Sequence, residues 1–69
     1  MNIKIYTIDC PQCLIIEKKF KQAGLNYEAI HDYQIFQEKG FVQFPIIEID
    51  GNLFSFSEAN KWLKTYKGE

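Results

Sequence analysis

The sequence predicts a small α/β domain in which a strand–helix–strand unit is followed by a helix, a β-hairpin and a last helix. Three observations predict this fold class. A run of β-branched residues leads into a segment of helical periodicity, Asp50-Gly51 gives a tight-turn signal between two later strand-like runs, and an amphipathic segment with the single Trp closes the pattern. The 69 residues leave room for one domain, which we expect to span residues 1–69.

The first half of the chain predicts a strand, a helix and a second strand. Residues 2–8 are dominated by β-branched side chains. In residues 11–23 the apolar side chains recur at helical spacing, and Gly24 supplies a C-terminal stop. Residues 26–31 form a shorter candidate strand. A strand–helix–strand unit of this length implies parallel pairing with a right-handed crossover.

The second half predicts a short helix and a hairpin. Residues 33–39 have Ile35 and Phe36 on one side and end at Gly40, which favours a helix. Residues 44–49 predict a strand that holds its proline near the start, where a missing N–H matters least. After the turn, residues 52–56 complete an antiparallel hairpin.

A last helix is predicted over residues 57–66. Its apolar stripe consists of Ala59, Trp62, Leu63 and Tyr66. Either Ser55 or Ser57 is a suitable N-cap. We expect residues 67–69 to be a frayed tail.

Composition limits the classes of partner. Six Phe, four Tyr and one Trp supply large apolar areas, so a short chain can build a core without cross-links. The formal net charge is −1, and acidic and basic residues are interspersed. This balance gives no electrostatic support for nucleic-acid or membrane-surface binding. Because a strand pattern follows Met1 directly, with no charged region leading to an apolar one, we expect a cytoplasmic protein, and we expect it to be a monomer.

The two cysteines of the chain lie three positions apart, in Cys10-Pro11-Gln12-Cys13, at the start of the first predicted helix. Positions i and i+3 share a helix face, so the two sulfurs can approach bonding distance. Pro11 suits the first helical position, and the free N–H groups and helix dipole favour a thiolate on Cys10, which Asp9 opposes. We therefore predict that Cys10 has a lowered pKa and attacks disulfides, and that Cys13 resolves the product.

Three other interpretations of the cysteine pair compete with this one. A structural disulfide would close a four-residue loop, which is worth only about 2 kcal/mol. A zinc ion normally takes four ligands, and the remaining candidates are His31 and acidic residues such as Asp9, so we expect no metal. Two inert, packed cysteines would take this spacing only by accident. Redox use in a reducing cytosol is the interpretation that we adopt.

The order of elements, with Cys-x-x-Cys at the first helix and Phe44-Pro45 opening the third strand, resembles the glutaredoxin branch of the thioredoxin fold. The resemblance covers nearly the whole chain and includes Trp62 in the last helix. It implies a four-stranded mixed sheet in the order 2-1-3-4 with helices on both faces, the first and third on one face and the second on the other. It also implies that Pro45 is cis and faces the cysteines.

The same resemblance implies a substrate site. In glutaredoxins the residue before the cis proline pairs with the backbone of glutathione, and here that residue is Phe44. Ser57 and Glu58 fall where the family offers a helix N-terminus and an acidic side chain to the γ-glutamyl end. The residues expected to shape the site are Tyr6, Asp9, Pro11 and Gln12.

Two departures from the family concern glutathione. Thr7-Ile8-Asp9 lacks the basic residue that usually precedes the first cysteine, and Asp9 would repel a carboxylate of glutathione. Phe54 and Ser55 stand in place of a glycine pair. His31 follows the second strand, where we expect a solvated or capping side chain.

The sequence therefore predicts a thiol–disulfide oxidoreductase of the glutaredoxin type, with no bound cofactor and with glutathione as co-substrate. One alternative is a redoxin that is reduced by thioredoxin reductase and donates electrons to ribonucleotide reductase. An alternative of another class is a module that binds an iron–sulfur cluster between two chains or binds a protein without turnover. Cys13 and Pro11 argue against the cluster, because they favour a closed disulfide cycle.

Overall fold

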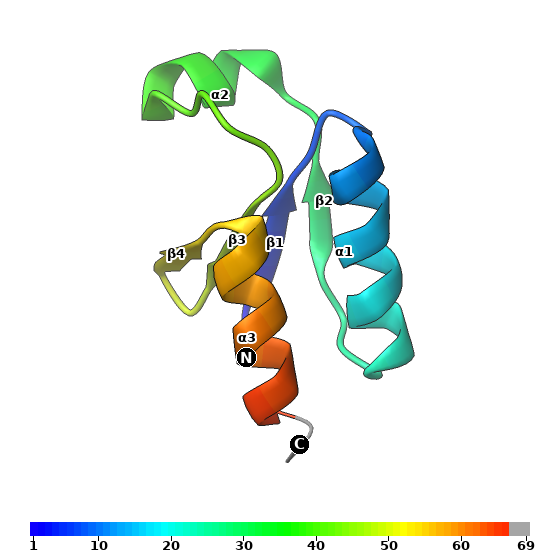
Figure 1. The fold of residues 1–69 in the computed structure, drawn as a ribbon. Helices are drawn as coiled ribbons and strands as arrows, with labels where there is room; N and C mark the ends of the chain where they lie inside the picture. The colour runs from blue at the N-terminus through cyan, green and yellow to red at the C-terminus, as the bar shows by residue number, and fades with distance from the viewer. Residues whose placement is uncertain (67–69) are drawn as a thin grey trace.

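The computed structural model describes residues 1–66 and has the order of elements that the sequence predicts (Figure 1). The elements are β1 (Ile3–Tyr6), α1 (Pro11–Gln22), β2 (Glu28–Ile30), α2 (Tyr33–Lys39), β3 (Ile46–Ile49), β4 (Asn52–Phe54) and α3 (Phe56–Tyr66). The predicted tail, residues 67–69, lies outside the described residues.

The four strands form one mixed sheet in the order β2-β1-β3-β4, as predicted. Strand β1 is parallel to β2 and antiparallel to β3, and β3 is antiparallel to β4. At the centre of the sheet, Ile5 lies opposite Ala29 on one side and Ile47 on the other. The carboxyl ends of β1 and β2 therefore lie side by side, which is where the loop to Cys10 begins.

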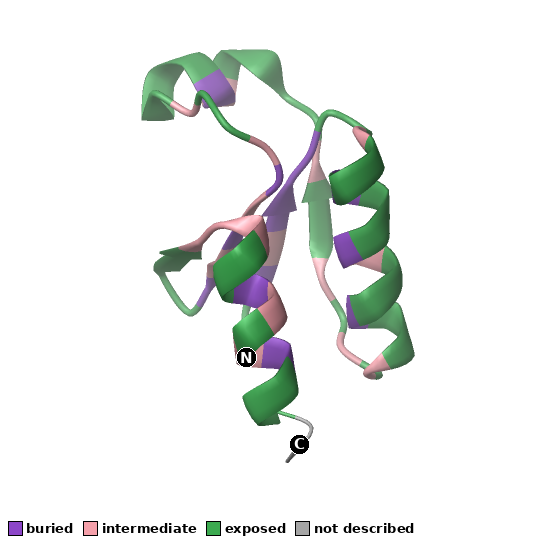
Figure 2. Ribbon diagram, in the orientation of Figure 1, coloured by how far each residue is buried: buried purple, intermediate pink, exposed green. Residues whose placement is uncertain are grey.

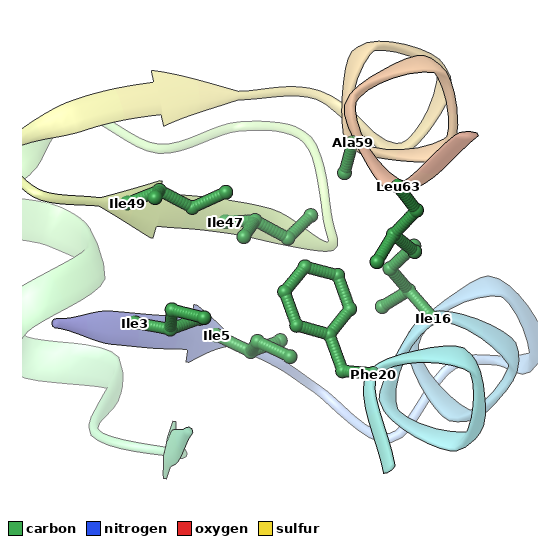
Figure 3. Close-up of a cluster of buried hydrophobic side chains, with 8 residues drawn as sticks. All are labelled: Ile3, Ile5, Ile16, Phe20, Ile47, Ile49, Ala59 and Leu63. Atoms are coloured by element: carbon green, nitrogen blue, oxygen red, sulfur yellow. The ribbon is translucent and has the colours of Figure 1, made fainter. Parts of the chain in front are cut away.

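Helices α1 and α3 cover one face of the sheet and turn their buried sides toward it and toward each other (Figure 2). The buried cluster between them consists of Ile3, Ile5, Ile16, Phe20, Ile47, Ile49, Ala59 and Leu63 (Figure 3). Phe20 is fully buried and stacks on Trp62 with 6.0 Å between ring centroids. This cluster fixes α1 on the sheet and so fixes the position of its first turn.

Helix α2 lies beyond the carboxyl end of β1 (Figure 1). Its buried Phe36 meets the Tyr6 ring edge to face at 6.2 Å, and Tyr6 points to the face opposite Ile3 and Ile5. Helices thus contact both faces, as predicted, although α2 does so only at the end of the sheet. Gly40, with φ of 71°, ends α2 and lets Phe41 return to Tyr6, with ring centroids 5.0 Å apart.

The strands are shorter than the sequence predicts. The chain leaves β1 after Tyr6, because Asp9 adopts a left-handed conformation with φ of 59°. The hairpin ends at Phe54, because Ser55 starts α3 through a capping box. The Ser55 Oγ accepts from the Glu58 N–H at 3.2 Å, and the Glu58 Oε1 accepts from the Ser55 N–H at 3.0 Å. The cap is therefore Ser55, and α3 begins one residue earlier than predicted.

None of the helices within residues 1–66 combines the length and the apolar composition needed to cross a bilayer.

Replacing Phe20 with Ala should lower the free energy of unfolding by about 3 to 5 kcal/mol, because it empties a fully buried site between the sheet and α3. Leu14→Ala is the matched control on the same helix. The Leu14 side chain is 55% exposed, so its loss should change stability by less than about 0.5 kcal/mol. Urea denaturation followed by circular dichroism measures both. Equal effects of the two substitutions would contradict the position of the core.

Candidate redox site

Cys10 is the N-cap residue of α1. Its backbone is extended (φ −70°, ψ 164°), and its Sγ accepts a hydrogen bond from the Cys13 N–H at 3.1 Å. Pro11 occupies the first helical position, as predicted, where no N–H is needed. The sulfur of Cys10 therefore lies at the positive end of the helix.

The two thiols differ in access. Both cysteines are free; Cys10 is partly exposed, whereas Cys13 is fully buried one turn into the helix. Gln12 and Pro11, between them, are exposed. A bulky disulfide can therefore reach Cys10 but not Cys13. The roles of attacking and resolving thiol stay a prediction.

Thr7 lies in the loop that leads to the cysteines, and the sequence analysis did not assign it to the site. The residue is fully buried, its N–H donates to the Ile30 carbonyl, and its Oγ1 accepts from the Asp9 N–H, both at 3.0 Å. Hydrogen bonding by its hydroxyl also helps to lower the pKa of Cys13. The signal was present in the alternation of β1, because Thr7 continues the face of Ile3 and Ile5 with a polar side chain.

The cysteines titrate as a pair. Burial and a hydrogen bond with the Cys13 side chain raise the pKa of Cys10, against the lowering effect of the Cys13 and Gln12 backbone. Burial also raises the pKa of Cys13, but hydrogen bonds with Cys10, Thr7 and the Ile8 backbone outweigh it, so the pKa of Cys13 is lowered. The predicted lowering at Cys10 is thus wrong for the reduced pair, because the buried Thr7 hydroxyl favours the thiolate on Cys13.

The segment before β3 approaches Cys10 from the other side. The Phe44–Pro45 peptide bond is cis, as the resemblance implies, and Pro45 is buried. The Cys10 Sγ lies 3.9 Å from the Phe44 carbonyl oxygen and donates a long hydrogen bond to it. Cys10 and Phe44, which are 34 positions apart, are therefore neighbours.

A groove of about 660 Å³ begins at Phe44. It is lined by Tyr33, Gln34, Phe36, Gln37, Phe41 and Phe44. The Phe36 and Phe44 rings lie 4.6 Å apart at its wall. The sequence analysis assigned Phe44 to the site but missed the other aromatic residues, which come from α2 and the loop after it.

Tyr6 packs against Phe36 and Phe41, two of the aromatic residues that line this groove. The residue is 2% exposed, and its hydroxyl donates to the Glu48 Oε1 at 2.9 Å. Burial and that hydrogen bond raise the pKa of Tyr6 to about 12. Tyr6 therefore stays neutral and shapes the site by supporting Phe36 and Phe41.

Ser57 and Glu58 lie at the start of α3 and are exposed. The hydrogen bond from the Ser55 backbone N–H lowers the pKa of Glu58, so its carboxylate is charged. One of its oxygens is already used in the capping box with Ser55. Fewer acceptor positions remain for a ligand than the resemblance implies.

His31 and Asp9 meet beside Cys10. The His31 side chain is half exposed, in line with the expectation of a solvated residue, but its Nε2 lies 3.0 Å from the Asp9 Oδ1. Sequence reasoning missed this contact, because the two residues are 22 positions apart. Within residues 1–66, no three His, Cys, Asp or Glu side chains are grouped so that they could hold a metal ion.

Comparison with solved structures relates the chain to small redox proteins. NrdH-redoxin from Escherichia coli, a glutaredoxin-like protein, matches with a TM-score of 0.68 and 25% identity over 88% of this chain and 93% of its own. The thioredoxin-like protein BC3987 matches with a TM-score of 0.70 and 26% identity over 90% and 99%. This chain is a glutaredoxin-like protein with the thioredoxin fold. Its function is accordingly a redox function of the glutaredoxin and thioredoxin type.

The fold also occurs as part of larger proteins. A glutathione S-transferase from Ascaris lumbricoides matches 99% of the glutaredoxin-like chain, with a TM-score of 0.76 and 23% identity, but the match covers only 37% of the transferase. That likeness concerns the fold alone. No protein-family model and no curated protein sequence matches the chain.

Thr7→Val should raise the pKa at which the cysteine pair first ionises, because it removes a hydroxyl that lowers the pKa of Cys13. A hydrogen bond to a charged group is worth about 1.5 to 3 kcal/mol, which corresponds to roughly 1 to 2 pH units. Thiolate absorbance in the ultraviolet, followed against pH, measures the shift. Thr65→Val removes an exposed helical hydroxyl and should titrate like the wild type; identical curves for both variants would exclude Thr7 from the site.

Proposed function

We propose that this protein is a dithiol oxidoreductase that reduces disulfides through Cys10 and Cys13. The observation that carries the proposal is the asymmetry of the pair. A partly exposed sulfur lies at a helix N-terminus, and a second, buried thiol lies behind it, with its backbone N–H 3.1 Å from the first sulfur. Such an arrangement is suited to attack by one thiol and resolution by the other.

The cycle conserves atoms and electrons. Cys13, with its lowered pKa, takes the proton of Cys10 as the Cys10 sulfur attacks a substrate disulfide. A mixed disulfide forms, and the first substrate sulfur leaves as a thiolate that takes a proton from water. Cys13 then returns its proton to solvent and attacks Cys10, and the second substrate sulfur leaves. Two electrons have passed to the substrate, and a Cys10–Cys13 disulfide remains.

The aromatic groove supports a polypeptide as the substrate. An extended chain that places its disulfide over Cys10 would lie beside the Phe44 backbone, 3.9 Å from the sulfur. A neighbouring apolar side chain of that substrate would fill the groove between Phe36 and Phe44. The groove offers space for a side chain next to the attacked disulfide, which favours protein disulfides over small-molecule disulfides.

For the reductant we favour a flavoprotein of the thioredoxin-reductase type over glutathione, although glutathione was the first expectation from the sequence. The loop of Thr7, Ile8 and Asp9 holds no cation for a carboxylate of glutathione. Glu58 is partly engaged by its own helix. NrdH-redoxin, a glutaredoxin-like protein, has a thioredoxin-like activity profile, and this chain covers 93% of its length.

Cys10→Ser should abolish reduction of insulin disulfides, whereas Cys13→Ser should block the second step and accumulate a mixed disulfide through Cys10. Serine is a good N-cap, so the first variant keeps the start of α1. Mass spectrometry of the non-reduced protein, after incubation with a disulfide substrate, identifies the trapped adduct. An adduct on Cys13 in the Cys10→Ser variant, or equal behaviour of the two variants, would reverse the assigned roles.

Oxidised protein should be reduced faster by NADPH with thioredoxin reductase than by NADPH with glutathione and glutathione reductase. Loss of NADPH absorbance, measured side by side at equal reductant capacity, decides between the two routes. Faster reduction by glutathione would restore the glutaredoxin-type route and leave the dithiol cycle unaffected.

A further inference from the structure

A polar pair lies beside Cys10 and takes no part in the proposed disulfide cycle. Asp9 directly precedes Cys10, and its Oδ1 lies 3.0 Å from the His31 Nε2. The two residues follow β1 and β2, and the parallel register that pairs Tyr6 with Ile30 brings them together. The pairing of β1 with β2 therefore positions the two residues next to each other.

The backbone holds Asp9 in one orientation. Its φ is 59°, a left-handed conformation that Asp tolerates better than most residues. Its N–H donates to the buried Thr7 Oγ1 at 3.0 Å. The side chains of His31 and Asp9 are 50% and 63% exposed, so their contact adds little to stability. The property of the pair that can act on an approaching disulfide is its charge, one residue away from Cys10.

The charge of the pair depends on the imidazole. With a neutral imidazole the pair carries the full negative charge of the Asp9 carboxylate, and with an imidazolium beside that carboxylate the pair is neutral. The titratable groups next to the pair along the chain are Cys10, which follows Asp9, and Asp32, which follows His31. Cys13 is hydrogen-bonded to Cys10 through its backbone N–H. The Asp32 carboxylate accepts from the backbone N–H groups of Gln34 and Ile35, which gives a constant background.

We propose that Asp9 and His31 form a selectivity element that disfavours anionic disulfides at Cys10, and that protonation of His31 relaxes this discrimination. The proposal rests on the proposed function only in taking Cys10 as the attacking sulfur. It names the class of substrate that the site accepts: disulfides without negative charge next to the attacked sulfur. Glutathione disulfide, with four carboxylates, belongs to the disfavoured class.

Alkylation of Cys10 tests the charge directly. Iodoacetamide is neutral and iodoacetate is an anion, yet both form the same sulfur–carbon bond with loss of iodide. All samples carry Cys13→Ser, because the Cys13 thiol would otherwise change charge with pH beside Cys10. The ratio of the two rates then cancels the fraction of Cys10 thiolate and reports only the local charge. The rates are measured by mass spectrometry of the Cys10 peptide at about pH 6 and about pH 8, because this is the range in which histidine side chains of proteins commonly change charge.

With the wild-type Asp9 and His31 in place, the iodoacetate-to-iodoacetamide ratio should fall about threefold from the lower to the higher pH, because the negative charge left on the pair by a neutral imidazole repels the anionic reagent. Asp9→Asn should raise the ratio about threefold at both pH values. His31→Gln keeps an N–H donor and should abolish the pH dependence, leaving the low ratio at both values.

Asp50→Asn is the matched control. Asp50 also has a left-handed backbone, with φ of 48°, and lies at the far end of the sheet, beside Ile49, so the change in net charge is the same. Its ratios should equal those measured with Asp50 in place. A pH dependence that survives His31→Gln, an unchanged ratio in Asp9→Asn, or an equal change for both reagents would overturn the proposal.

Insulin reduction, measured on the same Asp9 and His31 variants with Cys13 intact, separates this proposal from the proposed function. If insulin is not reduced but the alkylation ratios are as expected, the proposed oxidoreductase function is wrong and the proposed effect of Asp9 and His31 stands. Normal turnover together with alkylation ratios that do not change in the Asp9 and His31 variants would overturn the selectivity proposal and leave the oxidoreductase in place.

Discussion

The site depends on the burial of α1 against the sheet and α3. Ile16 and Phe20 are fully buried on the inner side of this helix, and they hold it in one position over Ile5 and Ile47. Cys13 lies on the same inner side, one turn from the start, and is buried by the same packing. Cys10 caps the helix and therefore emerges at the surface. The packing of a single amphipathic helix therefore explains why Cys10 is accessible and Cys13 is not.

The sequence predicted the parts of the protein that depend on local patterns. The order of elements and the placement of Pro11 in the first turn were predictable, because β-branched runs, helical spacing and turn residues act over a few positions. The order of the strands in the sheet followed from the resemblance to glutaredoxins. The cis peptide at Pro45 followed from resemblance. The bounds of α2 were also predictable, since Asp32 and Gly40 cap its two ends.

Contacts between distant segments were not predictable in this way. The aromatic groove joins α2 to the loop before β3, and a list of aromatic residues does not tell which of them will share a wall. The contact of His31 with Asp9 depends on the exact register of β1 and β2, and a slip of one residue would turn His31 to the other face. The prediction of a lowered pKa at Cys10 was wrong for a similar reason. The helix terminus is visible in the sequence, but the buried Thr7 hydroxyl that favours Cys13 becomes a neighbour only in the folded chain.

The loop between β1 and α1 holds, within three residues, a buried hydroxyl and an exposed carboxylate that have different effects on the cysteines. Thr7 belongs to the core and lowers the pKa of Cys13, whereas Asp9 belongs to the surface and carries a charge beside Cys10. The hydrogen bond from the Asp9 N–H to the Thr7 Oγ1 connects the two positions, so the surface charge and the buried donor are held in one geometry. In the proposed cycle Thr7 acts on proton transfer within the pair, and in the proposed selectivity element Asp9 acts on the approaching substrate. The rate of the chemical step and the choice of substrate would then vary separately. A single substitution in this loop can thus change selectivity while the fold and the cysteine pair remain the same.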